Sequence, residues 1–149
     1  MTVLLNIFLV IATFFFMEFM AWFTHKYVMH GFLWYLHKDH HDKSLAPHPF
    51  EKKDAFFLIF ALPSIILIIF GVAEFDYRFF IGIGIALYGA AYFFIHDLFI
   101  HQRTKVLRNA KGKYFTAVRR AHKMHHKHIN KEEGESFGML IVNKKYWAS

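Results

Sequence analysis

Near the start of the chain stands the apolar run VLLNIFLVIATFFFMEFMAWF, residues 3–23, which has 21 residues and one formal charge, Glu18. A helix of about 20 residues crosses the hydrocarbon core of a bilayer, so this run predicts a transmembrane span. We do not expect a cleaved secretory signal, because no basic residue precedes the run and no small-residue cleavage site follows it. Two further apolar runs, at residues 55–73 and 79–95, predict a second and a third span.

The composition agrees with a membrane protein. Of the 149 residues, 56% are hydrophobic and 20% are aromatic, which excludes a disordered chain because so much apolar surface would collapse. The formal net charge is +7 and the mean hydropathy is +0.26, and this combination indicates a bilayer rather than nucleic acid. With no cysteine, the chain has no disulfides, thiolate metal sites or iron–sulfur ligands. We expect a single all-α integral membrane domain over residues 1–149.

Lysine and arginine fall almost wholly on one side of the expected spans. Residues 24–54 contain five and residues 97–149 contain twelve of the 18, whereas the link 71–78 contains only Arg78. The positive-inside rule therefore predicts that residues 24–54 and 97–149 are cytoplasmic. The chain is then a multi-pass protein of the inner membrane, with its N-terminus on the outer side and a helical, histidine-rich cap in the cytoplasm.

The number of spans is expected to be three to four. A fourth span would require residues 79–100 to be split in two, because residues 103–131 are too charged to cross lipid. The short aromatic segments Phe32–Leu36 and Tyr114–Val118 are candidates for pieces that lie in the membrane interface.

Ten of the twelve histidines are grouped into four short motifs at or beyond the cytoplasmic ends of the spans. In chain order, the motifs are HKYVMH with His25 and His30, HKDHH with His37, His40 and His41, HDLFIH with His96 and His101, and HKMHH with His122, His125 and His126. The spacing HxxxxH followed by HxxHH thus occurs twice. A topology predicted from charge and length alone brings all four motifs to the same membrane face, which indicates a shared metal centre.

The HxxHH spacing suits metal ligation. Residues i, i+3 and i+4 share one face of a helix, so His37, His40 and His41 are expected to converge, as are the three histidines of HKMHH. In the HxxxxH motifs, an α-helix would leave the two rings about 140° apart. Either these pairs bind different metals or they lie where the helix loosens.

Ten imidazoles exceed what one ion takes, so we expect two metals. Imidazole suits zinc, copper, iron and nickel, and the spacing does not distinguish between them. A redox-active pair at a membrane face suggests oxygen chemistry on a lipid-soluble substrate. The remaining histidines, His48 and His128, are expected to lie outside the metal centre as ordinary structural or surface side chains.

Neutral imidazole ligands need hydrogen-bond acceptors that fix their tautomers. Asp39, Asp42 and Asp97 stand beside motif histidines in the sequence and are candidates for this role. Glu18 lies inside the first span, where an acid is costly and is therefore expected to be functional or paired. We expect Glu18 to orient a ligand or to pair with Arg103.

Five segments of the chain together resemble a known family. They are Met17–Gly31, HKDHH with the loop to Asp54, YFFIHDLFIHQR at Tyr92–Arg103, AHKMHH at Ala121–His126, and ESFGML at Glu135–Leu140. With these segments in order over nearly the whole chain, the sequence resembles the fatty-acid hydroxylase and sterol desaturase superfamily of histidine-rich membrane di-iron oxygenases. Within that superfamily it is most similar to the carotenoid hydroxylases.

The resemblance implies an activity and a substrate. Two irons held by the ten motif histidines would use O₂ at the cytoplasmic face to hydroxylate C3 of each β-ionone ring, taking β-carotene through β-cryptoxanthin to zeaxanthin. Echinenone and canthaxanthin are further carotenoid substrates, and a fatty acid or a sterol is the alternative class. A membrane metal transporter or haem ligation by histidine pairs would fit less well, because polar ligands are scarce within the spans.

Electrons for such a reaction need an outside source. The sequence has no GxGxxG fingerprint, no P-loop and no flavin signature, and the resemblance implies reduced ferredoxin, with its reductase, as the donor. A basic surface suits either an acidic partner of this kind or anionic lipid headgroups. It comprises Arg103, Lys105, Arg108, Lys111, Lys113, Arg119 and Arg120.

Overall fold

The computed structural model of the protein describes residues 2–42, 52–104, 107, 109–128 and 133–147. All regular secondary structure in these residues is helical, which confirms the all-α prediction. In chain order the elements are α1 (Val3–Phe23), η1 (Thr24–Phe32), α2 (Trp34–His41), η3 (Lys52–Asp54), α3 (Ala55–Gly71), α4 (Tyr77–Phe93), η4 (Phe94–Ile100), α5 (Lys113–Lys127) and η6 (Lys144–Tyr146).

Three helical segments are long and apolar enough to span a membrane: Val3–Phe32, Lys52–Gly71 and Tyr77–Ile100. They correspond to the three expected spans, and within the described residues there is no fourth. The second ends at Gly71, slightly before the expected boundary. The third begins at Tyr77, where the Asp76 side chain caps the helix by accepting a hydrogen bond from the Arg78 N–H.

Helix α4 packs against both other spans through two glycines. A Cβ at Gly82 would lie 2.9 Å from the carbonyl oxygen of Ser64 on α3, and a Cβ at Gly84 would lie 2.9 Å from the carbonyl oxygen of Val10 on α1. The Ser64 hydroxyl also donates a hydrogen bond of 2.8 Å to the Gly82 carbonyl. Small residues thus let the backbones approach closely, as is typical of helices in membranes. Gly89, in contrast, faces open space and takes no part in this packing.

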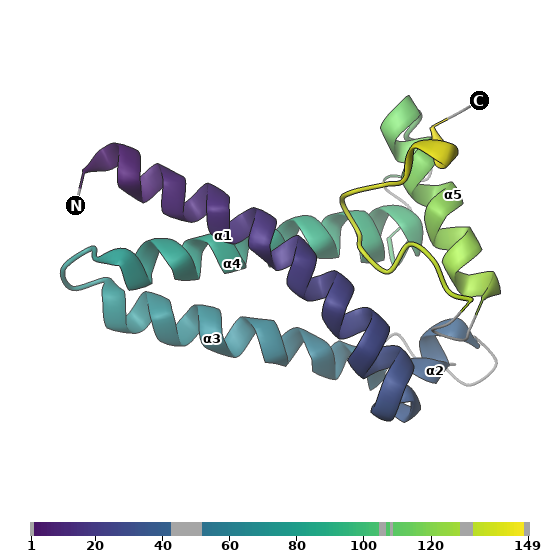
Figure 1. Ribbon diagram of the computed structural model, residues 1–149, viewed down its shortest axis with the longest axis horizontal. Coiled ribbons are helices and arrows are strands. Elements are labelled where there is room, and N and C mark those ends of the chain that lie inside the picture. The colour runs from purple at the N-terminus through teal and green to yellow at the C-terminus, as the bar shows by residue number, and fades with distance from the viewer. Residues whose placement is uncertain (1, 43–51, 105–106, 108, 129–132, 148–149) are drawn as a thin grey trace.

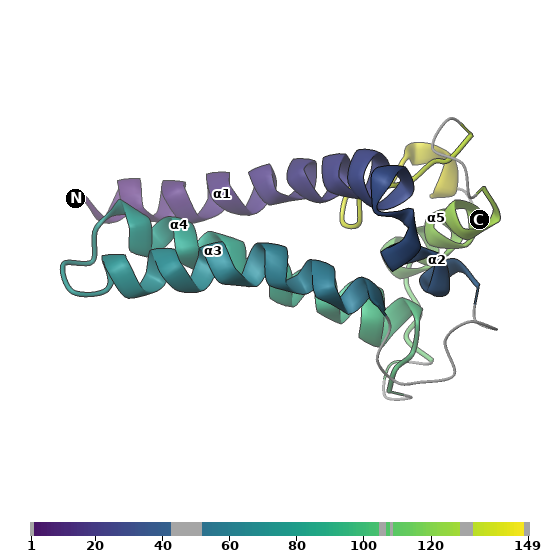
Figure 2. The ribbon, with the colours of Figure 1, turned by 90° about the horizontal axis from the view of Figure 1, so that it is seen from below.

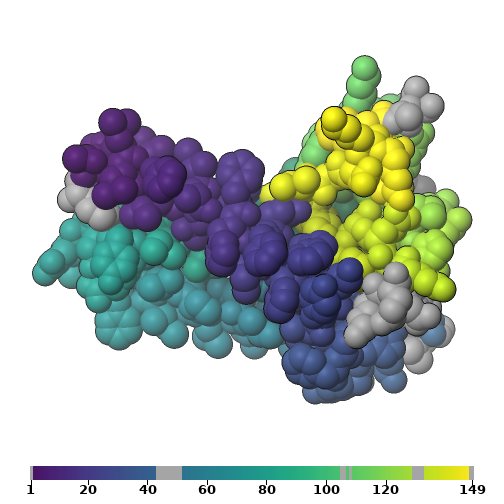
Figure 3. Space-filling model, in the orientation of Figure 1, coloured from purple at the N-terminus to yellow at the C-terminus, as the bar shows by residue number. Residues whose placement is uncertain are grey.

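The long helices run from one end of the molecule to the other, and different parts of the chain gather at the two ends (Figures 1 and 2). The N-terminus and the turn between α3 and α4 lie at one end. Helices α2 and α5 and the C-terminal segment 133–147 lie at the other end, as a cap on the three spans (Figure 1). The space-filling view shows the C-terminal segment, in yellow, lying on this cap beside α5 (Figure 3). Motifs from distant parts of the chain therefore meet in the cap.

Candidate metal centre

The two HxxxxH motifs lie in π-helical segments that continue membrane helices. His25 and His30 belong to η1, and His96 and His101 lie in or directly after η4. In a π-helix the backbone N–H bonds to the carbonyl five residues earlier, as the His101 N–H does to the His96 carbonyl at 3.0 Å. Residues five apart are then stacked one turn above the other, and the ring centroids lie 5.1 Å apart in the first pair and 4.6 Å apart in the second. The spacing left two alternatives: the rings of each pair bind different metals, or they lie where the helix is loosened. The structure shows the loosened helix.

One half of the motif histidines forms what we call the first histidine group: His25, His30, His37, His41 and His125. One ligand nitrogen from each lies within 4.8 Å of all the others. The Nε2 atom of His37 lies 3.0 Å from that of His25 and 3.2 Å from that of His41. The Nε2 atoms of His30 and His125 lie 3.2 Å apart. His37 and His125 are among the most deeply buried side chains of the protein.

The other half forms the second histidine group: His40, His96, His101, His122 and His126. Ligand nitrogens of four of them lie within 4.8 Å of one another, and the Nε2 atom of the fifth, His96, lies 3.2 Å from that of His40. The Nε2 atom of His122 lies 2.8 Å from those of both His101 and His126. The two groups adjoin, since the rings of His41 and His126 have centroids 4.4 Å apart.

The expectation that each HxxHH trio converges on one site is wrong. In HKDHH, the i and i+4 residues His37 and His41 join the first group, whereas the i+3 residue His40 turns to the second. The HKMHH motif does the reverse, because His125 joins the first group while its neighbours join the second. On a helix, the side chains at i+3 and i+4 point to opposite sides of the shared face. Two metal sites that lie side by side under that face therefore each receive one of these two rings. Each half of the sequence repeat thus supplies four histidines to its own group and one to the other.

Hydrogen bonds at the far side of three rings show which nitrogen carries the proton. The Nδ1 atom of His25 donates to the Phe137 carbonyl at 2.9 Å, and that of His125 donates to the Glu135 carbonyl at 3.1 Å. Carbonyl oxygens only accept, so these rings carry their proton on Nδ1 and present a bare lone pair at Nε2. His96 is held in the same way by the Asp97 carboxylate, at 3.1 Å from its Nδ1.

Lone pairs that converge in this manner repel unless a cation lies between them. At metal–nitrogen distances of about 2.0–2.1 Å, two ligands at right angles have nitrogens about 2.9 Å apart. The Nε2–Nε2 distances of 2.8–3.2 Å in both groups agree with this spacing. Ten imidazole nitrogens therefore fit two transition-metal ions, and both groups consist of histidine alone.

Electrostatics in the cap favours the neutral, ligating form of the rings. Burial, followed by the charge of neighbouring imidazoles, lowers the pKa of His41 to about 2 and that of His125 to about 3. Burial also holds the pKa values of His37, His40 and His122 well below their usual range. These rings remain unprotonated at physiological pH, which leaves their nitrogens available to a metal.

Of the three candidate acids, Asp97 is confirmed as a partner of a motif histidine. Besides His96 it contacts Lys53 Nζ at 3.0 Å and Arg103 Nε at 3.1 Å, so its charge is compensated in a buried position. Asp39 instead accepts a hydrogen bond of 2.8 Å from the backbone N–H of Lys52. Asp42 is an exposed residue at the end of α2.

Glu18 does not pair with Arg103, which corrects the second of the two expectations for this residue. The guanidinium of Arg103 lies beside Asp54, at 2.7 Å, as well as beside Asp97. Glu18 accepts hydrogen bonds from Tyr88 and from the backbone of the C-terminal segment.

The histidines outside the motifs do not enter either group. His128 follows the last turn of α5, where its N–H caps the helix by donating to the His125 carbonyl at 3.3 Å. His48 lies outside the described residues. The acceptors that sequence reasoning missed are the backbone carbonyls of Phe137 and Glu135. It also missed the buried Lys53, whose Nζ lies 3.5 Å from His96 Nδ1. A backbone carbonyl has no signature in the sequence, and only the family resemblance of the ESFGML segment marked this region.

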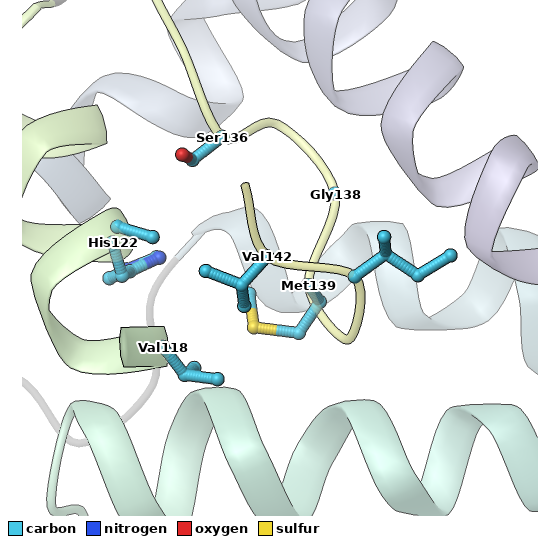
Figure 4. Close-up of a pocket in the computed structure, with 8 residues that line it drawn as sticks. Val118, His122, Ser136, Gly138, Met139 and Val142 are labelled. Atoms are coloured by element: carbon cyan, nitrogen blue, oxygen red, sulfur yellow. The ribbon is translucent and has the colours of Figure 1, made fainter. Parts of the chain in front are cut away.

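The second group is accessible from the surface. A depression of about 380 Å³ is lined by Ile100, His101, Gln102, Arg119, His122, Lys123 and His126. Three of these are histidines of the second group, and Arg119 and Lys123 make the mouth positively charged. A much smaller hollow of about 10 Å³ lies between α5 and the C-terminal segment, next to His122 (Figure 4).

Part of the expected basic surface is engaged in internal contacts. Arg103 bridges Asp54 and Asp97, and the Arg119 guanidinium lies 4.1 Å from the centroid of the Phe99 ring. Lys111, Lys113 and Arg120 are exposed. Lys105 and Arg108 lie outside the described residues.

Comparison with known proteins assigns the chain to a class of enzyme. The family model for fatty acid hydroxylases matches residues 10–143, and the chain therefore belongs to the fatty acid hydroxylase family. Among its relatives is the β-carotene hydroxylase of Pseudescherichia vulneris, which is 36% identical over 141 residues that cover 95% of this chain and 79% of the relative. The β-carotene hydroxylase of Pantoea ananas is 36% identical over 137 residues, covering 92% of this chain and 77% of the relative.

A plant relative shows the same likeness within a longer protein. The chloroplastic β-carotene 3-hydroxylase of an Oncidium hybrid cultivar is 38% identical over 136 residues, which cover 87% of this chain but 42% of the plant protein. The chain thus spans less than half of that relative and most of the bacterial ones. No solved structure is significantly similar to the chain.

Proposed function

We propose that the protein is a di-iron, O₂-dependent hydroxylase that acts on C3 of carotenoid β-ionone rings and converts β-carotene through β-cryptoxanthin to zeaxanthin. The observation that supports this most is the convergence of ten histidine Nε2 atoms, from four motifs, into two adjoining groups. The family model supports hydroxylation, and the names of the bacterial and plant relatives support a carotenoid as the substrate.

The chemistry requires a redox metal as well as the protein. Hydroxylation of a ring C–H bond consumes O₂, two electrons and two protons, and it yields the alcohol and one water. Acid–base side chains alone do not break an unactivated C–H bond, and iron bound by the two groups supplies the redox chemistry. The chain itself holds the ten imidazoles, fixes ring tautomers through Phe137, Glu135 and Asp97, and shields the buried nitrogens from bulk water.

We propose reduced ferredoxin as the source of the two electrons. The depression beside the second histidine group supports docking of an acidic protein there, because Arg119 and Lys123 line it and opposite charges steer association. The distance from this surface to the nitrogens of the group is short, since His101, His122 and His126 themselves form part of the lining.

We further propose that the cap faces the cytoplasm and that the protein resides in the inner membrane. The support is the distribution of charge, because 17 of the 18 lysines and arginines belong to residues 24–54 and 97–149, at or beyond the cap ends of the spans. The opposite end holds the N-terminus and the α3–α4 turn, where Arg78 is paired with Asp76 at 2.5 Å.

Expression in cells that accumulate β-carotene tests the proposal. With iron, O₂, ferredoxin and its reductase available, we expect pigment chromatography to detect β-cryptoxanthin and zeaxanthin. A His37→Ala variant should give neither product, whereas His128→Ala should give both, because His128 lies outside the two groups. Unchanged β-carotene with the unmodified chain would contradict the proposal. If hydroxylated fatty acids or sterols accumulated instead, the substrate would belong to the alternative class that the family name suggests.

A further inference from the structure

Glu18 is a buried acid within the first membrane-spanning segment, and the proposed chemistry does not use it. Its side chain is 5% exposed, although an ionised group in a membrane helix is costly. The carboxylate has no basic side chain among its hydrogen-bond partners in the described part of the chain. Its partners are instead four uncharged donors from two other parts of the fold.

Three of these donors are consecutive backbone N–H groups. The Oε1 atom accepts from Met139 at 2.9 Å, from Leu140 at 2.9 Å and from Ile141 at 3.0 Å. The Oε2 atom accepts from the Tyr88 hydroxyl of α4 at 2.6 Å. Successive N–H groups that converge in this way form an anion-binding concavity, and hydrogen bonds to an ionised acceptor are about twice as strong as neutral ones. A carboxylate, which only accepts, matches this set of donors.

The anchored segment is the one that holds two motif histidines. Two residues before Met139, the Phe137 carbonyl accepts the Nδ1 proton of His25, and two residues earlier the Glu135 carbonyl accepts that of His125. Figure 4 shows this segment looping past α5, with Ser136 and Met139 on the side of the loop nearer His122 and Gly138 at its far side. Gly138 fits under the carboxylate, because a Cβ there would lie 2.8 Å from Glu18 Oε1.

We propose that Glu18 is a positioning residue for the first histidine group alone: it anchors the backbone at residues 139–141, so that the carbonyls of residues 135 and 137 hold His25 and His125. The second group is independent of this anchor, since His96 is held by Asp97. The inference rests on the two-metal centre proposed above. It adds that a carboxylate within the membrane sets the metal affinity of one of the two groups.

The test measures ferrous iron bound per chain, without O₂, on purified protein in detergent micelles. Loss of an outer hydrogen-bond partner typically weakens metal binding about 10- to 100-fold. At iron concentrations that just fill both groups, we expect Glu18→Leu to lose about half of the bound iron, and Glu18→Gln to lose less because its amide oxygen still accepts. Tyr88→Phe, which removes the α4 contact but leaves the three N–H groups bonded, should keep both irons.

Combination with ligand variants identifies which group is affected. In a His122→Ala background, where only the first group is intact, Glu18→Leu should remove most of the remaining iron. In a His30→Ala background, where only the second is intact, it should change little. Equal loss in the two backgrounds, or full retention of iron in Glu18→Leu, would overturn the proposal.

Amide hydrogen exchange separates failure of the anchor from failure of the metal centre. In metal-free protein, Glu18→Leu should speed exchange at Met139, Leu140 and Ile141 at least about tenfold, because a hydrogen bond to a charged group is lost. If Glu18→Leu fails to fold, Gly138→Ala displaces the same contact without altering a membrane helix and should give the same selective loss of iron. Unchanged exchange and iron in Gly138→Ala would contradict the anchor, whereas fewer than two irons in the unmodified protein would contradict the proposed function.

Discussion

The Nε2 atoms of His30 and His125 lie 3.2 Å apart, although 95 positions separate the two residues in the chain. His30 belongs to the π-helical end of the first membrane segment, and His125 belongs to α5 of the cap. Their approach closes the first histidine group, because no other described member of that group comes from the C-terminal half of the chain. The group is therefore complete only when the cap has folded back onto the first span.

Removal of either ring is expected to empty the first group. We predict that His30→Ala and His125→Ala each lose about one of two irons per chain and all hydroxylation, and that the double variant loses no further iron, because both rings serve the same site. Metal analysis and pigment chromatography on the same preparation measure both effects. His128→Ala, at the end of the same helix as His125, is the matched control and should resemble the unmodified protein. Two irons retained in His30→Ala would refute the assignment of that ligand.

Neutralisation of Asp97 should weaken the second group. We expect Asp97→Asn to lower iron affinity there by about 10- to 100-fold, because the acceptor for His96 Nδ1 loses its charge. It also removes the charge of the carboxylate that contacts the buried Lys53 ammonium at 3.0 Å, so thermal stability should fall. Iron titration and thermal unfolding in detergent test the two effects. Asp76→Asn, which alters a half-buried carboxylate at the far end of α4, should leave iron binding unchanged.

Metal-free protein should lose stability as the pH falls below about 6.5. The folded state holds the pKa of His41 at about 2 and that of His125 at about 3, whereas the unfolded chain titrates near the ordinary value of 6.5. The unfolded state therefore takes up protons first, and stability that is complete above pH 6.5 is lost progressively down to about pH 3.

Thermal unfolding of the metal-free protein at about pH 7.5 and about pH 5 measures this dependence. His41→Leu should weaken it by removing one titrating group. A melting temperature that rises on acidification would show that the sign is wrong.

A methyl group at Gly84 should force α1 away from α4. The added Cβ would lie 2.7 Å from Thr13 Cβ and 2.9 Å from the Val10 carbonyl oxygen. Overpacking of this kind costs about 1–3 kcal/mol, so we expect Gly84→Ala to unfold at a lower temperature in detergent. Gly89→Ala on the same helix meets no atom within 4 Å and should be neutral or gain up to about 1 kcal/mol from its higher helix propensity. Equal effects of the two substitutions would show that α1 and α4 do not pack through Gly84.

The sequence by itself determined the membrane segments and the gathering of the histidines at one end. Span length is a local property, and a run such as residues 3–23 needs no partner to be recognised as a helix that lipid can surround. The repeated HxxxxH and HxxHH spacing likewise identified the ten ligand candidates. It left open how the five-residue spacing is accommodated, because an α-helix does not bring His25 and His30 together.

Only the tertiary structure decided how the ten rings are shared and what holds them. The i+3 residues His40 and His125 each turn to the group of the other repeat, because the two sites lie side by side between α2 and α5. The acceptors for His25 and His125 are backbone carbonyls, whose positions depend on where the C-terminal segment docks rather than on residue type. Glu18 was recognisable as a costly charge, but its partners are the Tyr88 hydroxyl and three backbone N–H groups more than 120 positions away. Such contacts form only when distant segments fold together, and no local pattern specifies them.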